Sequence, residues 1–174
     1  SAGGDIFAGG DFPGIGGVTS DNIIRWDGAA WNPIGTGVGL NNTYSFAYNS
    51  SGNKLYAGGW YDTNGGGRSF FVNEWDGAAW TVIGTGYGEV SALAYDSSGS
   101  KLYAGGSFSS VGAVSANNIA MWDGSWHKLA TEVGGSVNAL LCDASGNLYA
   151  GGYFYTGGGG QANYIAKWNG SSWS

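Results

Sequence analysis

The sequence predicts an all-β fold, and three observations lead to this prediction. One short motif occurs four times: an apolar, aromatic, Ala-Gly-Gly strand, followed by a Trp-Asp/Asn-Gly turn and a second Trp. The first Trp recurs after 49, 47 and 46 residues, a spacing typical of propeller blades and solenoid repeats. No segment has the sustained 3.6-residue apolar period of an amphipathic helix. Repeats of 46–49 residues with four short antiparallel strands are the blades of a β-propeller.

Each copy of the motif contributes a strand and a tight turn. The strand segments are Ile6–Gly10, Leu55–Gly59, Leu102–Gly106 and Leu148–Gly152. The turns lie between the members of four Trp pairs, which are Trp26 with Trp31, Trp75 with Trp80, Trp122 with Trp126, and Trp168 with Trp173. We therefore divide a single domain of residues 1–174 into approximate repeats 1–37, 38–86, 87–133 and 134–174.

The third repeat shows the expected strand order most clearly. Residues 90–95 form an apolar run that predicts a first strand, strand A, and turn residues follow it. Residues 101–108 are its hairpin partner, strand B, whose paired glycines indicate the close approach of a neighbouring group. Residues 118–122 and 126–129 are strands C and D, joined by an Asp-Gly turn that favours a tight hairpin.

The first and last copies are incomplete. Ser1 aligns with Ser50, which follows strand A, so the first copy has strands B, C and D only. Ser174 lies just past the Trp that opens strand D, and the chain holds about 3.7 blade repeats. Because closed rings avoid unpaired sheet edges, three explanations compete: part of a longer propeller, a four-bladed ring with one defective blade, or a half that pairs with a second copy. The predicted partner is another propeller segment or a second copy of the chain that completes the ring.

Composition and charge exclude several functions. Six Lys and Arg against twelve Asp and Glu give a net charge of −6, so we expect no binding to nucleic acid or to an anionic membrane. No apolar run is long enough to predict membrane insertion. Cys142 is the only Cys, and no Cys/His spacing predicts a metal or cofactor site. A chain poor in Lys and rich in Gly, Ser, Asn and Tyr is common among extracellular and cell-surface proteins, where we place it.

The repeat resembles those of a known family. The string AGG-x-F, a Gly-rich loop, NIA-x-WDG-x-x-W, IGTG and V-x-A-L-A is similar to the kelch-like, galactose-oxidase-type propeller repeats of bacterial surface and secreted proteins. It is also similar to the propeller of fungal cortical cell-polarity markers. The aromatic residue after the glycines is Phe12, Tyr61, Phe108 and Phe154 in the four copies. The resemblance implies a propeller fold and a surface location, and it implies no reaction.

Catalysis is not predicted. Galactose oxidase binds copper through two His and two Tyr, whereas His127 is the only His of this chain. The acidic residues Asp27, Asp76 and Asp123 lie in the predicted turns, where a carboxylate accepts backbone N–H groups. No pair of carboxylates is singled out for glycoside hydrolysis. We therefore expect a noncatalytic module for binding, structure or protein–protein interaction.

The Trp pairs carry the remaining functional prediction. We expect the first Trp of each pair to pack blade against blade together with a glycine of strand B, a set formed by Trp26, Trp75, Trp122, Trp168, Gly9, Gly58, Gly105 and Gly151. The second Trp opens the outermost strand, where one face is nearer solvent. The candidate ligand-binding residues are therefore Trp31, Trp80, Trp126 and Trp173.

An alternative function is that of a lectin with one shallow Trp-lined site per blade. Small propeller lectins contain a similar W-D-G-x-x-W string, in which aromatic rings stack on the sugar while Arg and Glu bond its hydroxyl groups. Arg25 and Glu74 each precede a first Trp here and are the corresponding candidates, although no copy has both charges. The ligands that this resemblance implies are glycans.

Overall fold

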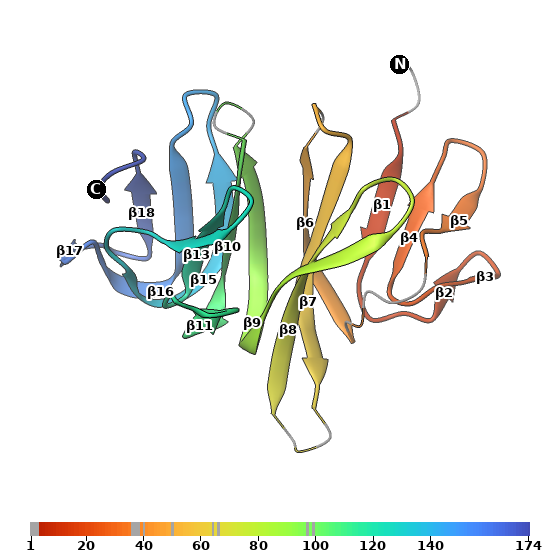
Figure 1. Cartoon of the computed structure of the whole chain (residues 1–174), viewed down its shortest axis with the longest axis horizontal. Helices are drawn as coiled ribbons and strands as arrows, with labels where there is room; N and C mark the ends of the chain where they lie inside the picture. The colour runs from red at the N-terminus through yellow and green to blue at the C-terminus, as the bar shows by residue number, and fades with distance from the viewer. Residues whose placement is uncertain are drawn as a thin grey trace.

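The computed structural model is all-β, and it describes residues 4–35, 39, 41–49, 51–63, 65, 67–96, 98 and 100–174. Among these residues every regular element is a strand, and the strands pair in antiparallel sheets. The sheets stand in a row, with the first repeat at one end and the fourth repeat at the other (Figure 1). The described strands do not form a closed ring. The predicted all-β fold class is confirmed.

The first repeat forms a three-stranded sheet in the order β1-β4-β5. Its strands are β1 (Ile6–Gly9), β4 (Ile23–Trp26) and β5 (Trp31–Pro33), which correspond to strands B, C and D. Between β1 and β4 the chain makes a small hairpin of β2 (Gly14–Ile15) and β3 (Val18–Thr19). Strand β1 pairs with β4 on one side only, so it is the edge of this sheet.

The second and third repeats share one sheet of seven strands, because a single long strand belongs to both. The strands are β6 (Asn42–Asn49), β7 (Lys54–Asp62), β8 (Arg68–Trp75), β9 (Trp80–Asp96), β10 (Lys101–Phe108), β13 (Ile119–Trp122) and β14 (Trp126–Lys128). Residues 80–87 of β9 pair with β8, and residues 88–96 pair with β10. Strand D of the second repeat thus continues into strand A of the third without a break (Figure 1).

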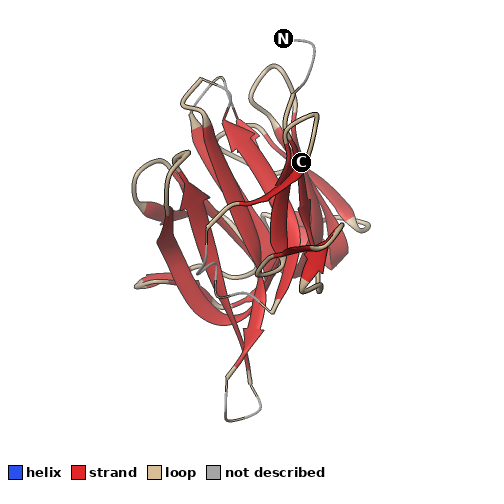
Figure 2. Cartoon of the chain, turned by 90° about the vertical axis from the view of Figure 1, so that its right-hand side faces the viewer, coloured by secondary structure: helices blue, strands red, loops and turns tan. Residues whose placement is uncertain are grey.

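The fourth repeat forms a separate sheet of β15 (Val133–Cys142), β16 (Leu148–Gly157) and β18 (Ile165–Trp168). A single bridge between Trp168 and Trp173 marks the start of strand D. As in the first repeat, the loop between strands B and C contains short additional strands. In the third repeat β11 (Ser110–Val111) pairs with β12 (Val114–Ser115). In the fourth repeat β17 (Gly160–Gln161) pairs with β16. In the second repeat the β7–β8 hairpin is longer and projects beyond the neighbouring strands (Figures 1 and 2).

Close approach requires both glycines of strand B in the second and third repeats. The second glycine lies against backbone: a Cβ on Gly106 would be 2.0 Å from the Glu89 carbonyl oxygen, at a register shift between β9 and β10. The first glycine lies against the next repeat, and a Cβ on Gly105 would be 2.6 Å from the Val137 side chain. Real Cβ atoms do not approach other atoms this closely. Close approach at the paired glycines therefore agrees with the sequence pattern.

Each repeat sheet has one side toward the preceding repeat and one toward the following repeat, because side chains alternate along a strand. In the third repeat, Leu102 and Ala104 pack into a core shared with the second repeat. Tyr103 and Ile119 pack into a core shared with the fourth. Figure 2 views the row from the end of the first sheet, with the later sheets behind it.

The two ends of the row leave apolar positions uncovered. Ile165 of the fourth repeat is 64% exposed, whereas its counterparts Ile23, Val72 and Ile119 are 2%, 0% and 0% exposed. Likewise, the atom nearest to a Cβ position on Gly151 is 3.8 Å away, unlike the much closer atoms at Gly9, Gly58 and Gly105. The side of the fourth sheet that would face a following repeat is therefore open in the described structure.

Candidate functional site

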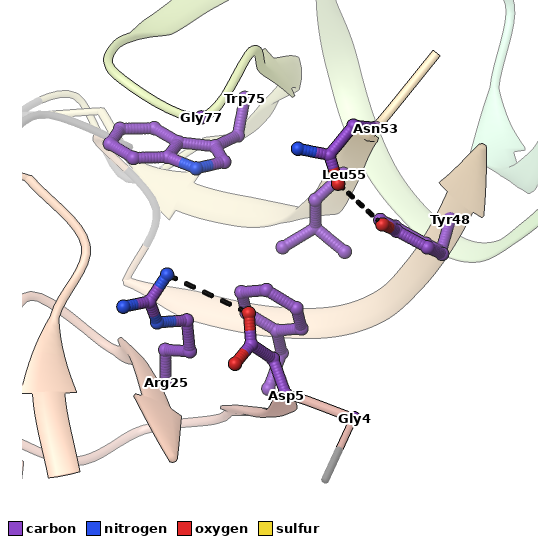
Figure 3. A pocket seen from close by; sticks show the side chains of 9 residues that line it. Gly4, Asp5, Arg25, Tyr48, Asn53, Leu55, Trp75 and Gly77 are labelled. Carbon is purple, nitrogen blue, oxygen red and sulfur yellow. Dashed lines mark hydrogen bonds and ion pairs between the residues drawn. The ribbon is translucent and has the colours of Figure 1, made fainter. Parts of the chain in front are cut away.

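The candidate site is a groove of about 450 Å³ between the first and second repeat sheets, here the first groove. One wall and part of the floor come from the first sheet, and the other wall comes from the second. The lining residues are Gly4, Asp5, Phe7, Arg25, Tyr48, Asn53, Leu55, Trp75 and Gly77 (Figure 3).

The first groove combines an aromatic wall with polar groups. In Figure 3 the indole of Trp75 lies on one side of the opening, and Arg25 and Asp5 lie on the other. A terminal nitrogen of Arg25 is 3.6 Å from a carboxylate oxygen of Asp5, and both side chains are about two-fifths exposed. The Tyr48 hydroxyl donates a 2.6 Å hydrogen bond to the Asn53 side-chain oxygen. An apolar surface beside a few oriented polar groups is the usual composition of a small-molecule site.

Equivalent grooves occur at the next two junctions. The second groove, of about 200 Å³, is lined by Tyr56, Glu74 and Trp122, which correspond to Phe7, Arg25 and Trp75. The third groove has a volume of about 460 Å³. It is lined by Tyr103, Met121 and Trp168, which occupy the corresponding positions one repeat later in the sequence. The repeat therefore builds the same type of groove three times, always from strands B and C of one sheet and the first Trp of the next.

The three grooves differ in charge. Asp5, which immediately precedes strand B, pairs with Arg25 on strand C in the first groove. In the second groove the signs are exchanged, and Lys54 donates a 2.6 Å hydrogen bond to Glu74. In the third groove Lys101 faces Met121 at the same two positions. A charged ligand matched to one groove would therefore meet a different charge pattern in the others.

The second Trp of each pair joins its own repeat to the preceding one. The indole N–H of Trp80 donates to the Ile34 carbonyl at 2.7 Å, that of Trp126 to Ile83 at 2.6 Å, and that of Trp173 to Thr131 at 2.8 Å. The two rings of every pair also contact each other, with centroids 5.4 to 5.5 Å apart. None of the four predicted ligand-binding rings, Trp31, Trp80, Trp126 and Trp173, lines one of the three grooves.

The first Trp of the following repeat lines each groove instead, although the sequence pattern assigned Trp75, Trp122 and Trp168 to blade packing. The structure also brings Arg25 together with Trp75, 50 positions along the chain, rather than with its neighbour Trp26. Consecutive residues of a strand point to opposite sides of a sheet, and this alternation is the sequence signal that separates Arg25 from Trp26. The same reasoning places Glu74 with Trp122.

No family model matches the chain, and no match was found among curated proteins. None of the described residues belongs to a helix long and apolar enough to cross a lipid bilayer.

The acidic turn residues have structural partners. One carboxylate oxygen of Asp76 accepts the backbone N–H groups of Ala78 and Ala79 at 2.8 and 2.9 Å. These bonds, with that from Ala79 the stronger cause, lower the pKa of Asp76 below its ordinary value of 3.8. Asp27 accepts the equivalent pair of bonds, and Asn169 accepts them through its amide oxygen in the fourth repeat. The first turn residue must therefore accept two backbone hydrogen bonds, and the neutral amide of Asn can do so in place of the Asp carboxylate.

We expect Asp76→Asn to lower the melting temperature at about pH 7 and to have a smaller effect at about pH 2. Because the folded-state pKa is lowered, the carboxylate stabilises the fold above its unfolded pKa, and this contribution disappears as the pH falls through the folded value. Melting curves followed by circular dichroism at both pH values measure the difference. A difference that is equally large at both pH values would contradict a role for the charge.

His127 does not complete a catalytic arrangement. Its Nε2 atom is 3.0 Å from an Asp123 carboxylate oxygen and 2.9 Å from the Ser125 hydroxyl. A general base that activates a hydroxyl uses one ring nitrogen for the hydroxyl and the other for the carboxylate, whereas both partners here share one nitrogen. Burial raises the pKa of the Cys142 thiol to about 12, so this thiol is a poor nucleophile. The described residues include no group of three or more His, Cys, Asp or Glu side chains placed to hold a metal ion.

Proposed function

We propose that the chain is a noncatalytic β-propeller module that acts outside the cell or at its surface and binds a ligand in the first groove. The observation that carries this proposal is the recurrence of one groove at three successive junctions, each with an aromatic wall from the following repeat. A surface that served packing alone would have no need of the exposed ion pair and the Asn53 amide that line the first groove.

The arrangement of the strands supports the propeller architecture. The three complete strands A belong to β6, β9 and β15, and each of these elements lies beside the next. Strands B, C and D follow in order away from them. Neighbouring sheets that meet at their first strands, with the later strands farther out, are the arrangement of blades around an axis.

Carbohydrate is the ligand class that the first groove favours. The apolar face of a sugar ring stacks on an indole, which Trp75 offers here, and sugar hydroxyls bond well to charged and amide groups. Asp5, Arg25 and Asn53 supply these groups at the same opening. The resemblance of the W-D-G-x-x-W turn to propeller lectins gives the lectin function independent support.

Binding to a glycan array, followed by calorimetric titration of the best glycan, tests this function. We expect Arg25→Ala to weaken binding at least about tenfold, because hydrogen bonds to charged groups contribute roughly 1.5–3 kcal/mol. Arg68→Ala is the matched control, since Arg68 also pairs with a carboxylate, that of Glu89, and does not line the groove.

Equal losses in both Arg variants would place the glycan outside the first groove. If no glycan binds at high protein concentration, the lectin function is wrong, and a module with other binding partners remains as the proposal.

A further inference from the structure

Two tyrosines of the fourth repeat lie side by side where strand B leads into the loop toward strand C. Tyr155 belongs to β16, and Tyr164 immediately precedes β18. Their rings are in contact, with centroids 5.0 Å apart and ring planes inclined by 59°. The Tyr164 hydroxyl donates a 2.8 Å hydrogen bond to the Tyr155 hydroxyl oxygen. The two phenols are thus held with their hydroxyl ends, and the ortho carbons beside them, close together.

Both side chains are open to solvent. Tyr155 is 62% exposed and Tyr164 is 49% exposed. The residues at the same positions of the third repeat, Ser109 and Asn118, are exposed and half-buried, although the fourth repeat follows them. The exposure of the two tyrosines therefore comes from their place within the repeat, and a reagent in solution can reach both rings.

The backbone at Tyr164 is unusual for an aromatic residue. Its φ is 68°, in the left-handed region. The corresponding residues of the first and third repeats are Asn22 and Asn118, with φ of 64° and 65°. Asn tolerates this conformation better than a residue with a large side chain does. Local backbone preference therefore does not explain a Tyr at this position, and a strained residue of this kind indicates a role for its side chain.

Backbone hydrogen bonds fix the spacing of the two tyrosines. The Ala162 N–H donates to the Tyr155 carbonyl oxygen at 2.7 Å. The Tyr164 N–H donates to the Phe154 carbonyl oxygen at 3.0 Å. The third repeat has the equivalent pair of bonds, but among the four repeats only the fourth has a tyrosine at both positions. A common backbone frame thus carries a pair of phenols in one repeat alone.

We propose that Tyr155 and Tyr164 are a site of oxidative cross-linking, at which a haem peroxidase outside the cell joins the two rings into dityrosine. The peroxidase takes one electron from each phenol, which also loses its hydroxyl proton, and the two phenoxyl radicals form a carbon–carbon bond between their ortho carbons. Each ortho carbon then loses its hydrogen as a proton while each oxygen regains one. The protein loses two hydrogen atoms in all, and hydrogen peroxide accepts them to give two molecules of water. The identity of the oxidant rests on the proposed extracellular location.

The cross-link supplies a covalent bond that sulfur cannot supply here. Cys142 is the only Cys, so residues 1–174 form no disulfide among themselves. A bond between residues 155 and 164 closes the loop that joins β16 to β18, and closing a loop restricts the unfolded chain. Dityrosine therefore acts as a staple between strands B and C of the fourth repeat.

The whole chain at micromolar concentration is treated with a plant haem peroxidase and hydrogen peroxide. We expect dityrosine fluorescence, a monomer lighter by two hydrogen atoms, and a proteolytic fragment in which residues 155 and 164 are joined. Tyr155→Phe and Tyr164→Phe each remove one phenol. We expect either variant to lower the dityrosine fluorescence at least about tenfold, because groups held on one chain meet at effective concentrations of about a millimolar or more, whereas separate chains meet at micromolar concentration.

Tyr153→Phe is the matched control. Tyr153 lies on the same strand, two residues before Tyr155, and is 75% exposed, so its change removes an equally accessible phenol. We expect this variant to give the same yield of cross-linked monomer as the unchanged chain. Within the described part of the chain, Tyr56 and Tyr95 are the only other tyrosines in ring contact, and Tyr56 is buried. Each variant keeps its aromatic ring and is expected to fold, which melting curves verify.

Dityrosine formed only between chains, a monomer product that joins other residues, or an equal loss of fluorescence in all three variants would overturn the proposal. In the cross-linked monomer we also expect slower hydrogen exchange at the Ala162 and Tyr164 amides, because the new bond restrains the loop that these amides close. Unchanged exchange would contradict the role as a staple. Residues 155 and 164 do not line the first groove, where glycan binding is measured separately, so either proposal can fail without the other.

Discussion

We expect Trp126→Ala to lower the free energy of unfolding by about 3–5 kcal/mol, as large-to-small changes of buried aromatic residues do. The Trp126 side chain lies in the core between the second and third repeats and is 9% exposed. Its removal leaves a cavity against Trp122 and deprives the Ile83 carbonyl of its 2.6 Å hydrogen bond. Urea unfolding followed by circular dichroism measures the loss.

Two further variants separate packing from hydrogen bonding. Trp126→Phe keeps a ring but removes the N–H donor, and we expect an intermediate loss. Trp31→Ala is the matched control, because Trp31 holds the same place in the first repeat without a preceding repeat among the described residues. An unchanged urea midpoint in Trp126→Ala would contradict the role of the second Trp in joining repeats.

The second large effect is expected from Gly105→Ala, which should destabilise the chain by about 1–3 kcal/mol. The added methyl group would lie 2.6 Å from Val137 and 3.1 Å from Leu140, both on strand A of the fourth repeat. The two sheets would have to separate to admit it. Thermal or urea unfolding measures the change.

Gly151→Ala supplies the control at the equivalent position, where the nearest atom is 3.8 Å from the Cβ site. We expect no measurable loss of stability for this variant. If both glycine variants are equally destabilised, the close approach of the next repeat is not the cause.

The strand order could be predicted from the sequence because local signals agree with the final structure. The predicted strand B of the third repeat, residues 101–108, coincides with β10, and strand C differs from β13 by one residue at its start. The Asp-Gly turns and the paired glycines indicate where these strands lie, because Gly adopts backbone conformations and fits close contacts that residues with a side chain do not.

The continuity of β9 could not be predicted in the same way. Gly84 and Gly86 interrupt its sequence, and glycine weakens a strand when only local preference is considered. In the structure a Cβ on Gly84 would lie 2.7 Å from the Trp126 ring, and one on Gly86 would lie 2.7 Å from the Phe70 ring. The glycines are therefore required by side chains distant in sequence, which no local pattern records.

The residue set of the first groove could not be predicted for a related reason. Residues next to each Trp in the sequence belong to one repeat, whereas Arg25 and Trp75 meet only because two sheets pack side by side. Alternation along the strand shows that Arg25 and Trp26 face apart, but the partner of Arg25 depends on how consecutive repeats stack. Packing between repeats is a tertiary property, so the residue set of the groove required the structure.

The unbroken strand β9 has a consequence for how the molecule can move. Because β9 is hydrogen-bonded to both β8 and β10, we expect the second and third repeats to move largely together. The third and fourth repeats, in contrast, are joined through residues 129–132, which lie outside any strand. We therefore expect the third groove to widen more easily than the second, because the connection beside it is a loop and not a strand.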